Sequence, residues 1–389
     1  MIKIPQYETM FSLYLTFVAL IPCMILRFME KKSKLLDLFV SLIFIASFLG
    51  IHSIQILEFV AFIIFETLLI YAYKAFRNKS TSELVDYIVF VLSMLPLLWV
   101  RLCASDPVVS TIIGFTGISY MCFKIWQLLF EIHDGRIEKL NFVDMLLFLL
   151  FFPSFTSGPI SRYEGFVGDY SNKLSREDYF NNHFRFGLRK ILLGVFYKFA
   201  MAFYVNEFVI SKLPEEVKVY HIIIYAYMYT IYLFFDFAGY SNIAIGFGYL
   251  MGVRLPENFN KPFLACNMKE FWARWHMSLS TWFNDYVYGR FVLNNVRNGL
   301  FKNTKTASRW AYLFTMTTMG LWHGFLLHYL IYGVYEGILL VITDYWVKSK
   351  KYREFKKKKY YQAVCIVVCF QFIAFGMLLF SGKYLFDRA

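Results

Sequence analysis

The sequence predicts an all-α protein that crosses a membrane about ten or eleven times. Hydrophobic residues make up 58% of its 389 residues, and the mean hydropathy is +0.49. A soluble domain contains fewer apolar residues than this. Apolar runs close to the length of a spanning helix recur along the whole chain, and short basic segments separate several of them. We therefore expect one integral-membrane domain over residues 1–389.

Eleven apolar runs are the expected helices. In chain order they are Met10–Phe28, Asp37–Ile51, Ile54–Tyr73, Leu84–Val100, Thr111–Ile132, Phe142–Phe155, Ile191–Ile210, Ile222–Val253, Trp310–Leu321, Leu326–Val347 and Val364–Leu385. The shorter runs predict tilted, re-entrant, interfacial or buried segments beside the full crossings. The first run predicts a retained helix, because it is too long for the apolar core of a signal peptide and lacks a small-residue cleavage site.

Positive charge is concentrated in a few loops. The formal net charge is +13, and Lys348–Lys359 alone carries eight basic residues and one acidic residue. The positive-inside rule predicts that this loop, Glu30–Lys34 and Lys74–Lys79 are cytoplasmic, with the N-terminus outside. The basic loop either contacts anionic lipid headgroups or docks an acidic cytoplasmic partner. Nucleic-acid binding is not expected, because no nucleic-acid module accompanies the charge.

Cysteine spacing gives no support for a disulfide framework or a zinc site. The six cysteines are scattered, mostly within apolar runs, and none forms a C-x-x-C pair. The histidines that stand out are far apart in sequence and have no obvious third ligand, so no metal centre is expected.

Residues Lys269–Tyr288 form an unusually polar and aromatic stretch in an apolar chain. Glu270 and Arg274 have the i, i+4 spacing of a helical ion pair. One helical stripe is expected to hold Trp272, Trp275, His276 and Leu279. The stretch is either an amphipathic helix at the membrane interface or a helix that directs His276 into a cavity.

A second histidine lies in the apolar phrase TMGLWHG. His323 is at bilayer depth by hydropathy, where an ionisable residue suggests a functional site. The alternative is a neutral core histidine bonded to a neighbour. Gly320 and Gly324 leave room beside it for a substrate or a close helix. His328 is expected to be structural, because five residues place it about 140° around the helix.

Two further polar islands interrupt the apolar pattern. In FFDFAGYSN (Phe234–Asn242), Asp236 could orient an imidazole, bind a substrate ammonium group, or cap a helix broken near Gly239. In TSGPISR (Thr156–Arg162), the Gly-Pro pair predicts a helix end followed by a loop that lines a cavity.

These phrases together resemble the membrane-bound O-acyltransferase family. They appear in the order FTSGPISRY, FFDFAGYSN, PENFNKPF, KEFWARWHMSLSTWF and MGLWHG, within a core of about residues 150–345. The two histidines are 323 − 276 = 47 residues apart and match the paired signature positions. The closest likeness is to the branch that D-alanylates teichoic acids in Gram-positive bacteria. Tyr288–Asn298 lacks the Gly-rich segment usual in the branch that O-acetylates alginate.

The resemblance implies a ring of tilted helices around a thinned centre, with a tunnel between the two membrane faces. It implies a D-alanyl thioester donor on the 4'-phosphopantetheine arm of an acidic cytoplasmic carrier protein, and no cofactor bound to the chain itself. The acceptor is lipoteichoic or wall teichoic acid, or an intermediate membrane acceptor.

The resemblance also assigns roles to the histidines. His323 maps to the catalytic histidine, and a neutral imidazole can remove the acceptor hydroxyl's proton as the ester bond forms. His276 maps to its partner, which either holds the acceptor or polarises the thioester carbonyl. Further candidates for the substrate tunnel are Asp236, Tyr240, Asn242, Trp275, Ser278 and Arg162. The oxyanion donor is left open among Trp275, Ser278, Asn242 and a backbone N–H.

One short segment suits a carrier-docking surface. It offers apolar side chains between two arginines, namely Arg290, Phe291, Val292, Leu293 and Arg297. The alternative is an interfacial anchor in lipid. Two other functions stay open at this point, an O-acetyltransferase of an exopolysaccharide and a non-enzymatic D-alanine transporter that uses intramembrane His and Asp residues as a proton relay.

Overall fold

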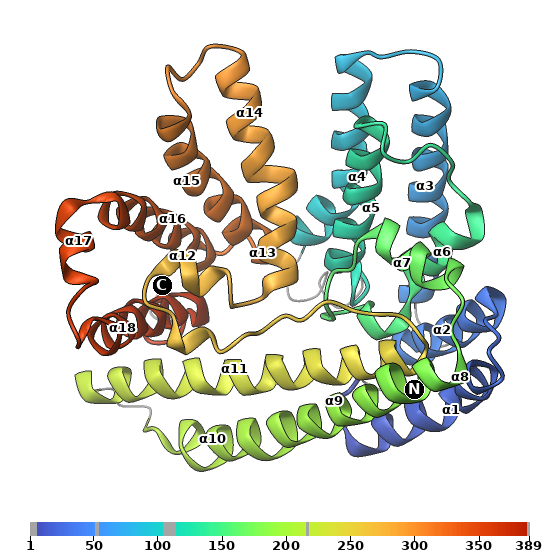
Figure 1. Ribbon diagram of the computed structural model, residues 1–389, viewed down its shortest axis with the longest axis horizontal. Coiled ribbons are helices and arrows are strands. Elements are labelled where there is room, and N and C mark those ends of the chain that lie inside the picture. The colour runs from blue at the N-terminus through green and yellow to red at the C-terminus, as the bar shows by residue number, and fades with distance from the viewer. Residues whose placement is uncertain (1–5, 51–53, 104–113, 215–217, 387–389) are drawn as a thin grey trace. The chain divides into compact units, whose positions relative to one another are not determined.

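The computed structural model describes residues 6–50, 54–103, 114–214 and 218–386. Within these ranges the chain is helical, with a single isolated β-bridge (Figure 1). It divides by internal packing into two compact units, which are described separately. Unit 1 comprises Met1–Gly194 and Tyr240–Pro256, and unit 2 comprises Val195–Gly239 and Glu257–Ala389.

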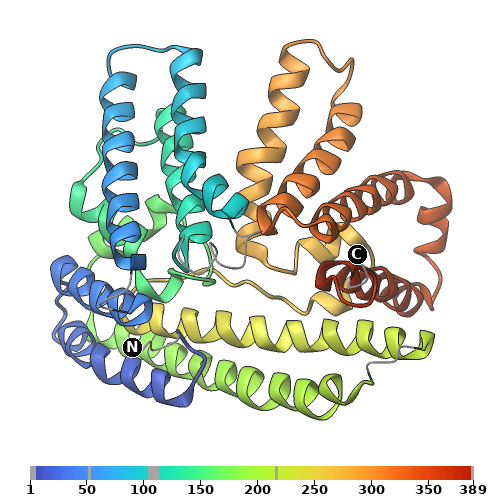
Figure 2. The ribbon, with the colours of Figure 1, turned by 180° about the vertical axis from the view of Figure 1, so that it is seen from behind.

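Unit 1 is built mainly from the N-terminal helices. They are α1 (Met10–Phe28), α2 (Lys34–Leu49), α3 (Ile54–Arg77), α4 (Glu83–Cys103), α5 (Ile118–His133), α6 (Phe142–Leu150), α7 (Tyr163–Ser171), α8 (Arg176–Asp178) and α9 (Arg185–Val195), whose last residue belongs to unit 2. Thr9 begins α1 with a reciprocal capping box, and Ser33 caps α2. The hairpin of α3 and α4 and the pair of α1 and α2 are visible from both sides (Figures 1 and 2).

The helices of unit 1 are apolar outside and polar inside. Leu57 and Leu68 of α3 are 70% and 66% exposed, whereas Glu66 on the same helix is fully buried. A buried ion pair joins Arg27 of α1 to Asp37 of α2, with both side chains fully buried. This inversion of the soluble pattern is expected when the surrounding solvent is lipid.

Unit 2 contains the C-terminal helices. They are α10 (Phe203–Phe208), α12 (Met268–Trp272), α13 (Met277–Phe283), α14 (Gly289–Arg297), α15 (Thr304–His323), α16 (Leu327–Lys348), α17 (Lys350–Phe355) and α18 (Tyr361–Ser381). The 32-residue helix α11 (Val219–Leu250) lies in unit 2 up to Gly239 and in unit 1 from Tyr240. Because α11 is continuous, the helix break predicted near Gly239 is wrong.

Glycines set how closely the helices pack. A Cβ added to Gly320 of α15 would lie 2.4 Å from the carbonyl oxygen of Tyr329, and one added to Gly333 of α16 would lie 2.5 Å from that of Met316. Only glycine permits such backbone contact, a common device between membrane helices. Of the two possible uses predicted for Gly320, the structure shows the close helix.

The predicted all-α, multi-pass class is confirmed, whereas the number of span-length helices among the described residues is lower than the ten or eleven crossings predicted. Each of the eleven apolar runs contains helix, although Ile51 and residues 111–113 lie outside the described residues. In the described part of the chain, seven helical segments have the length and composition of a membrane span. One of them is the run Arg176–Lys212, in which π-helical turns link α8, α9 and α10. The protein is a multi-pass membrane protein, and its shorter helices α2, α5 and α6 fall below the length of a full crossing.

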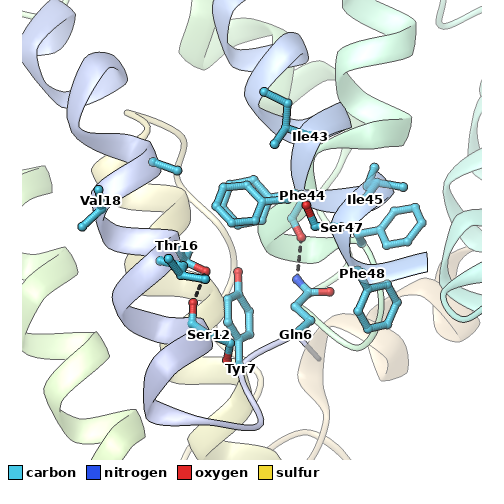
Figure 3. A pocket seen from close by; sticks show the side chains of 14 residues that line it. Gln6, Tyr7, Ser12, Thr16, Val18, Ile43, Phe44, Ile45, Ser47 and Phe48 are labelled. Atoms are coloured by element: carbon cyan, nitrogen blue, oxygen red, sulfur yellow. Dashed lines mark hydrogen bonds between the residues drawn. The ribbon is translucent and has the colours of Figure 1, made fainter. Parts of the chain in front are cut away.

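Unit 1 also encloses an apolar cavity of about 260 Å³ between α1 and α2 (Figure 3). Ser12 and Thr16 contribute hydroxyls to its lining, and Phe44 and Phe48 contribute rings. The Gln6 amide donates to the Phe152 carbonyl at 2.7 Å, which fixes the chain entering α1 against the 3₁₀ turn that follows α6.

Candidate active site

His276 lies at a break between two short helices. It forms the N-cap of α13 with φ +44° and ψ +52°, a left-handed conformation that costs a non-glycine residue about 1–2 kcal/mol. The prediction of a continuous helical stripe through Trp272, Trp275, His276 and Leu279 is therefore wrong. The Glu270–Arg274 pair is present, with nitrogen and oxygen 2.5 Å apart.

A neighbouring segment holds this break in place. The backbone oxygen of Asn258 accepts from the Met277 N–H at 2.9 Å, and its side-chain oxygen accepts from the Ser278 hydroxyl at 2.6 Å. Phe259 and Trp275 form the isolated antiparallel bridge. The segment Pro256–Phe263 (PENFNKPF) thus holds the turn at His276 through Asn258 and Phe259, and we call these contacts the Asn258 clamp. Sequence reasoning used this phrase only as a family motif and missed the positioning role of Asn258.

The His276 imidazole is buried among aromatic rings. Its side chain is 5% exposed, and its ring meets Phe237 of α11 at 4.7 Å in an edge-to-face arrangement. Burial lowers the pKa of His276 to about 3, with a further lowering from His323. The imidazole is therefore neutral near pH 7, as a hydrogen-bonding or proton-accepting role requires.

His323 ends α15 directly before Gly324. Its ring stacks on Tyr329 at 5.9 Å and meets the edge of Phe380 of α18 at 4.9 Å. Its side chain is half-buried, in contrast to that of His276. Both histidines belong to unit 2, and His323 is near enough to contribute to the lowered pKa of His276, so the structure places the two sequence candidates near each other.

The other tunnel candidates are engaged by neighbours within their own units. Asp236 pairs with Lys198 at 2.5 Å, and the Ser278 hydroxyl is engaged by Asn258. Trp275 is buried and stacks on Phe271. In unit 1, Tyr240 bonds to Thr156, Asn242 accepts from the Lys190 ammonium group at 3.1 Å, and Arg162 forms the N-cap of α7. The contacts of these residues do not assign any of them a role in the site.

A cavity of about 370 Å³ adjoins the segment that carries His276. Its lining includes Met277 and Ser280 of α13, Lys269 and Trp272 of α12, and Thr315 of α15. The Trp272 indole N–H donates to Glu336 at 3.0 Å, which fixes one wall against α16. Sequence reasoning missed Lys269 and Thr315. The signal available for Lys269 was its position two residues before the FWARWH phrase.

The predicted docking residues lie on helix α14, where some are buried and others are exposed. Val292 is buried with Ala307 and Ala311, and the Phe291 ring stacks on Phe314 at 5.0 Å. Leu293 is 70% exposed, and Arg297 is exposed, whereas Arg290 is half-buried. Only part of the segment can therefore meet a partner.

The basic segment Lys348–Lys359 begins at the end of α16 and contains α17. Tyr352 anchors it, because its side chain is buried and its hydroxyl lies 2.7 Å from that of Tyr361. The lysines around it are exposed, as a lipid-facing or partner-facing loop requires.

Comparisons with known proteins identify the family of this chain. The membrane-bound O-acyltransferase family model matches residues 9–386. A teichoic acid D-alanyltransferase of Bacillus subtilis (strain 168) is 38% identical, covering 97% of this chain and 98% of the relative. The protein of that name from Streptococcus thermophilus is 35% identical, covering 97% and 95%. A probable alginate O-acetylase of Pseudomonas putida is 32% identical, but covers 58% of this chain and 45% of the relative.

The family match over residues 9–386 spans both histidine segments and the helices that position them. The chain belongs to the membrane-bound O-acyltransferase family and is an acyl-transferring enzyme.

Proposed function

We propose that the protein moves D-alanine from a cytoplasmic carrier-protein thioester towards teichoic acid outside the membrane. The observation that carries this proposal is likeness over 97% of the chain to proteins named teichoic acid D-alanyltransferase, at 38%, 35% and 30% identity. Probable alginate O-acetylases of Pseudomonas match over 58% to 69% of the chain, and this favours transfer of a D-alanyl group over transfer of an acetyl group.

The proposed chemistry uses His323 as the general base. Its neutral imidazole takes the proton of the acceptor hydroxyl while the hydroxyl oxygen attacks the thioester carbonyl carbon. The tetrahedral intermediate then collapses, the carbon–sulfur bond breaks, and the imidazolium returns the proton to the departing thiolate. Such a base contributes about 10²–10⁴-fold to the rate. The half-buried position of His323 supports this role, because a base must be reached by two substrates.

His276 is proposed to position the acceptor or polarise the carbonyl. The His276 side chain suits this role because it is buried and its backbone turn is held by Asn258. Its pKa is lowered to about 3, so the imidazole is neutral near pH 7. The donor arrives on the 4'-phosphopantetheine arm of an acidic carrier protein. Leu293 and Arg297 are the exposed members of the proposed docking surface on α14.

A reconstitution assay tests the reaction class and the donor. The full chain is placed in vesicles with labelled D-alanyl carrier protein on one side and a membrane acceptor with free hydroxyls on the other. The proposal expects label bound covalently to the acceptor. Transfer from an acetyl donor alone would replace the substrate assignment, and release of free D-alanine across the vesicle without an ester product would support the transporter instead.

A further inference from the structure

A groove on the outer face of α15 and α16 joins an apolar channel to a cationic recess. The channel has a volume of about 330 Å³, and its lining includes Leu313 of α15 and Ile338, Ile342 and Tyr345 of α16. The recess lies at the first turns of α15 and is lined by Asn303, Thr304, Lys305, Thr306 and Arg309. Thr306 and Arg309 line both, so the polar and apolar parts are continuous.

The apolar part faces the membrane. Ile338 and Ile342 are 47% and 55% exposed on α16, a helix with the length and composition of a membrane span. An exposed apolar groove on a spanning helix is covered by lipid acyl chains unless another helix occupies it. In the described part of the chain, no segment covers this groove.

The polar end carries more positive than negative charge. The Asp344 carboxylate pairs with three cations, Lys269 at 2.7 Å, Arg309 at 3.1 Å and Lys348 at 2.5 Å. Lys305 adds a fourth cation and forms no ion pair within the described residues. Of these four cations, Arg309 and Lys305 line the recess itself, and the one carboxylate is shared with two further cations, so the recess suits an anion.

Arg309 is oriented for phosphate recognition. Its Nε donates to Asp344, and its guanidinium lies 3.5 Å from the centre of the Tyr345 ring. Among the described residues its two Nη groups have no hydrogen-bond acceptor. A planar guanidinium fixed on one edge and stacked on a ring can offer its remaining N–H groups to a phosphate in a bidentate manner.

The geometry points to a binding site for an anionic glycerophospholipid, with its phosphate headgroup on Arg309 and Lys305 and an acyl chain in the α15–α16 groove. This inference goes beyond the proposed function, because neither transfer chemistry nor the carrier protein enters it. Net charge and an adjoining apolar channel distinguish such a site from the general attraction of basic loops to a membrane.

Native mass spectrometry of the purified full chain in detergent tests the site. Phosphatidylglycerol is titrated against zwitterionic phosphatidylcholine, and the variants are Arg309→Gln and Ile338→Trp. The first removes the headgroup contact. The second fills the channel at an exposed position and leaves the charge unchanged. Lys351→Gln is the matched control, because it removes one positive charge from exposed α17 outside the groove.

We expect one phosphatidylglycerol to be retained in preference to phosphatidylcholine, with affinity reduced roughly tenfold or more by Arg309→Gln, in line with loss of a charge-assisted hydrogen bond. Ile338→Trp should weaken binding and Lys351→Gln should not. Inorganic phosphate at millimolar concentration should not displace the lipid. Equal retention of both lipids, equal loss in Lys351→Gln, unchanged binding in Ile338→Trp, or displacement by phosphate would each overturn the inference.

Discussion

Gly320→Ala should displace the helix end that carries His323. The added Cβ would lie 2.4 Å from the Tyr329 carbonyl oxygen, whereas ordinary contacts begin at 3.4 Å, so the two backbones must separate by 3.4 − 2.4 = 1.0 Å or the chain must bend. Neither atom belongs to a flexible side chain that could move aside. His323 follows three residues later in the same helix, so it moves with this displacement.

The expected effects of Gly320→Ala on stability and on rate follow from this displacement. Overpacking a tight contact costs about 1–3 kcal/mol of stability. A misplacement of about 1 Å at a catalytic group can lower the rate by roughly 10²-fold. The assay is carrier-dependent D-alanyl transfer in vesicles, with kcat and KM measured separately and the amount of folded protein determined by size-exclusion chromatography. We expect a large fall in kcat with a folded, inserted protein.

Gly165→Ala is the matched control. Gly165 lies in α7, and an added Cβ meets nothing within 4 Å. Alanine there should raise helix stability by about 0.5–1 kcal/mol and leave transfer unchanged. Transfer within about threefold of the wild type in Gly320→Ala would refute the reasoning that the glycine crossing positions His323.

Three further predictions concern the clamp, the buried imidazole and the docking helix. Asn258→Ala should lower kcat by at least about tenfold, and adding Ser278→Ala should cost little more, because both changes remove one shared hydrogen bond; additive losses in a double-mutant cycle would contradict the clamp. The pKa of His276 is lowered from 6.5 to about 3, so the unfolded chain binds the extra proton and stability falls with acidification through this window. At pH 5 this costs about 2 kcal/mol of folding stability relative to neutral pH. His276→Gln should therefore reduce the pH dependence of the melting temperature between pH 5 and pH 7, and an unchanged dependence would refute the assignment of a buried, neutral His276. Leu293→Asp should raise KM for the carrier with the fold intact, whereas Val292→Asp should destabilise the protein, because its side chain is packed on Ala307 and Ala311; equal melting temperatures would argue against this division.

The sequence predicted the helices well, because a bilayer imposes a simple length and polarity rule. Met10–Phe28 matches α1 residue for residue, and Leu326–Val347 matches α16 to within one residue at each end. Phe142–Phe155 is less regular, since α6 ends at Leu150 and a 3₁₀ turn containing Pro153 follows. Proline lacks the N–H that a continued helix would need.

The details of the site depended on tertiary contacts that periodicity does not contain. Helical spacing placed His276 on a continuous stripe, whereas the bonds from Asn258 and the bridge at Phe259 hold it in a left-handed turn. Asp236 was recognised as a notable carboxylate, but its partner Lys198 is 38 residues away and has no sequence signal. The family resemblance identified both histidines. It could not identify the α15–α16 groove, which depends on the exposed faces of two neighbouring helices.

The central claim is that His323 performs the acyl transfer. The most direct measurement compares single-turnover transfer of labelled D-alanine by wild type, His323→Ala and His328→Ala, each in vesicles with loaded carrier and acceptor. His328 is the matched control, because it is a nearby histidine that packs against Tyr329 and Phe386. The account predicts that ester formation falls by at least roughly 10²-fold in His323→Ala alone, with carrier binding retained. Normal transfer by a folded His323→Ala protein would contradict the account.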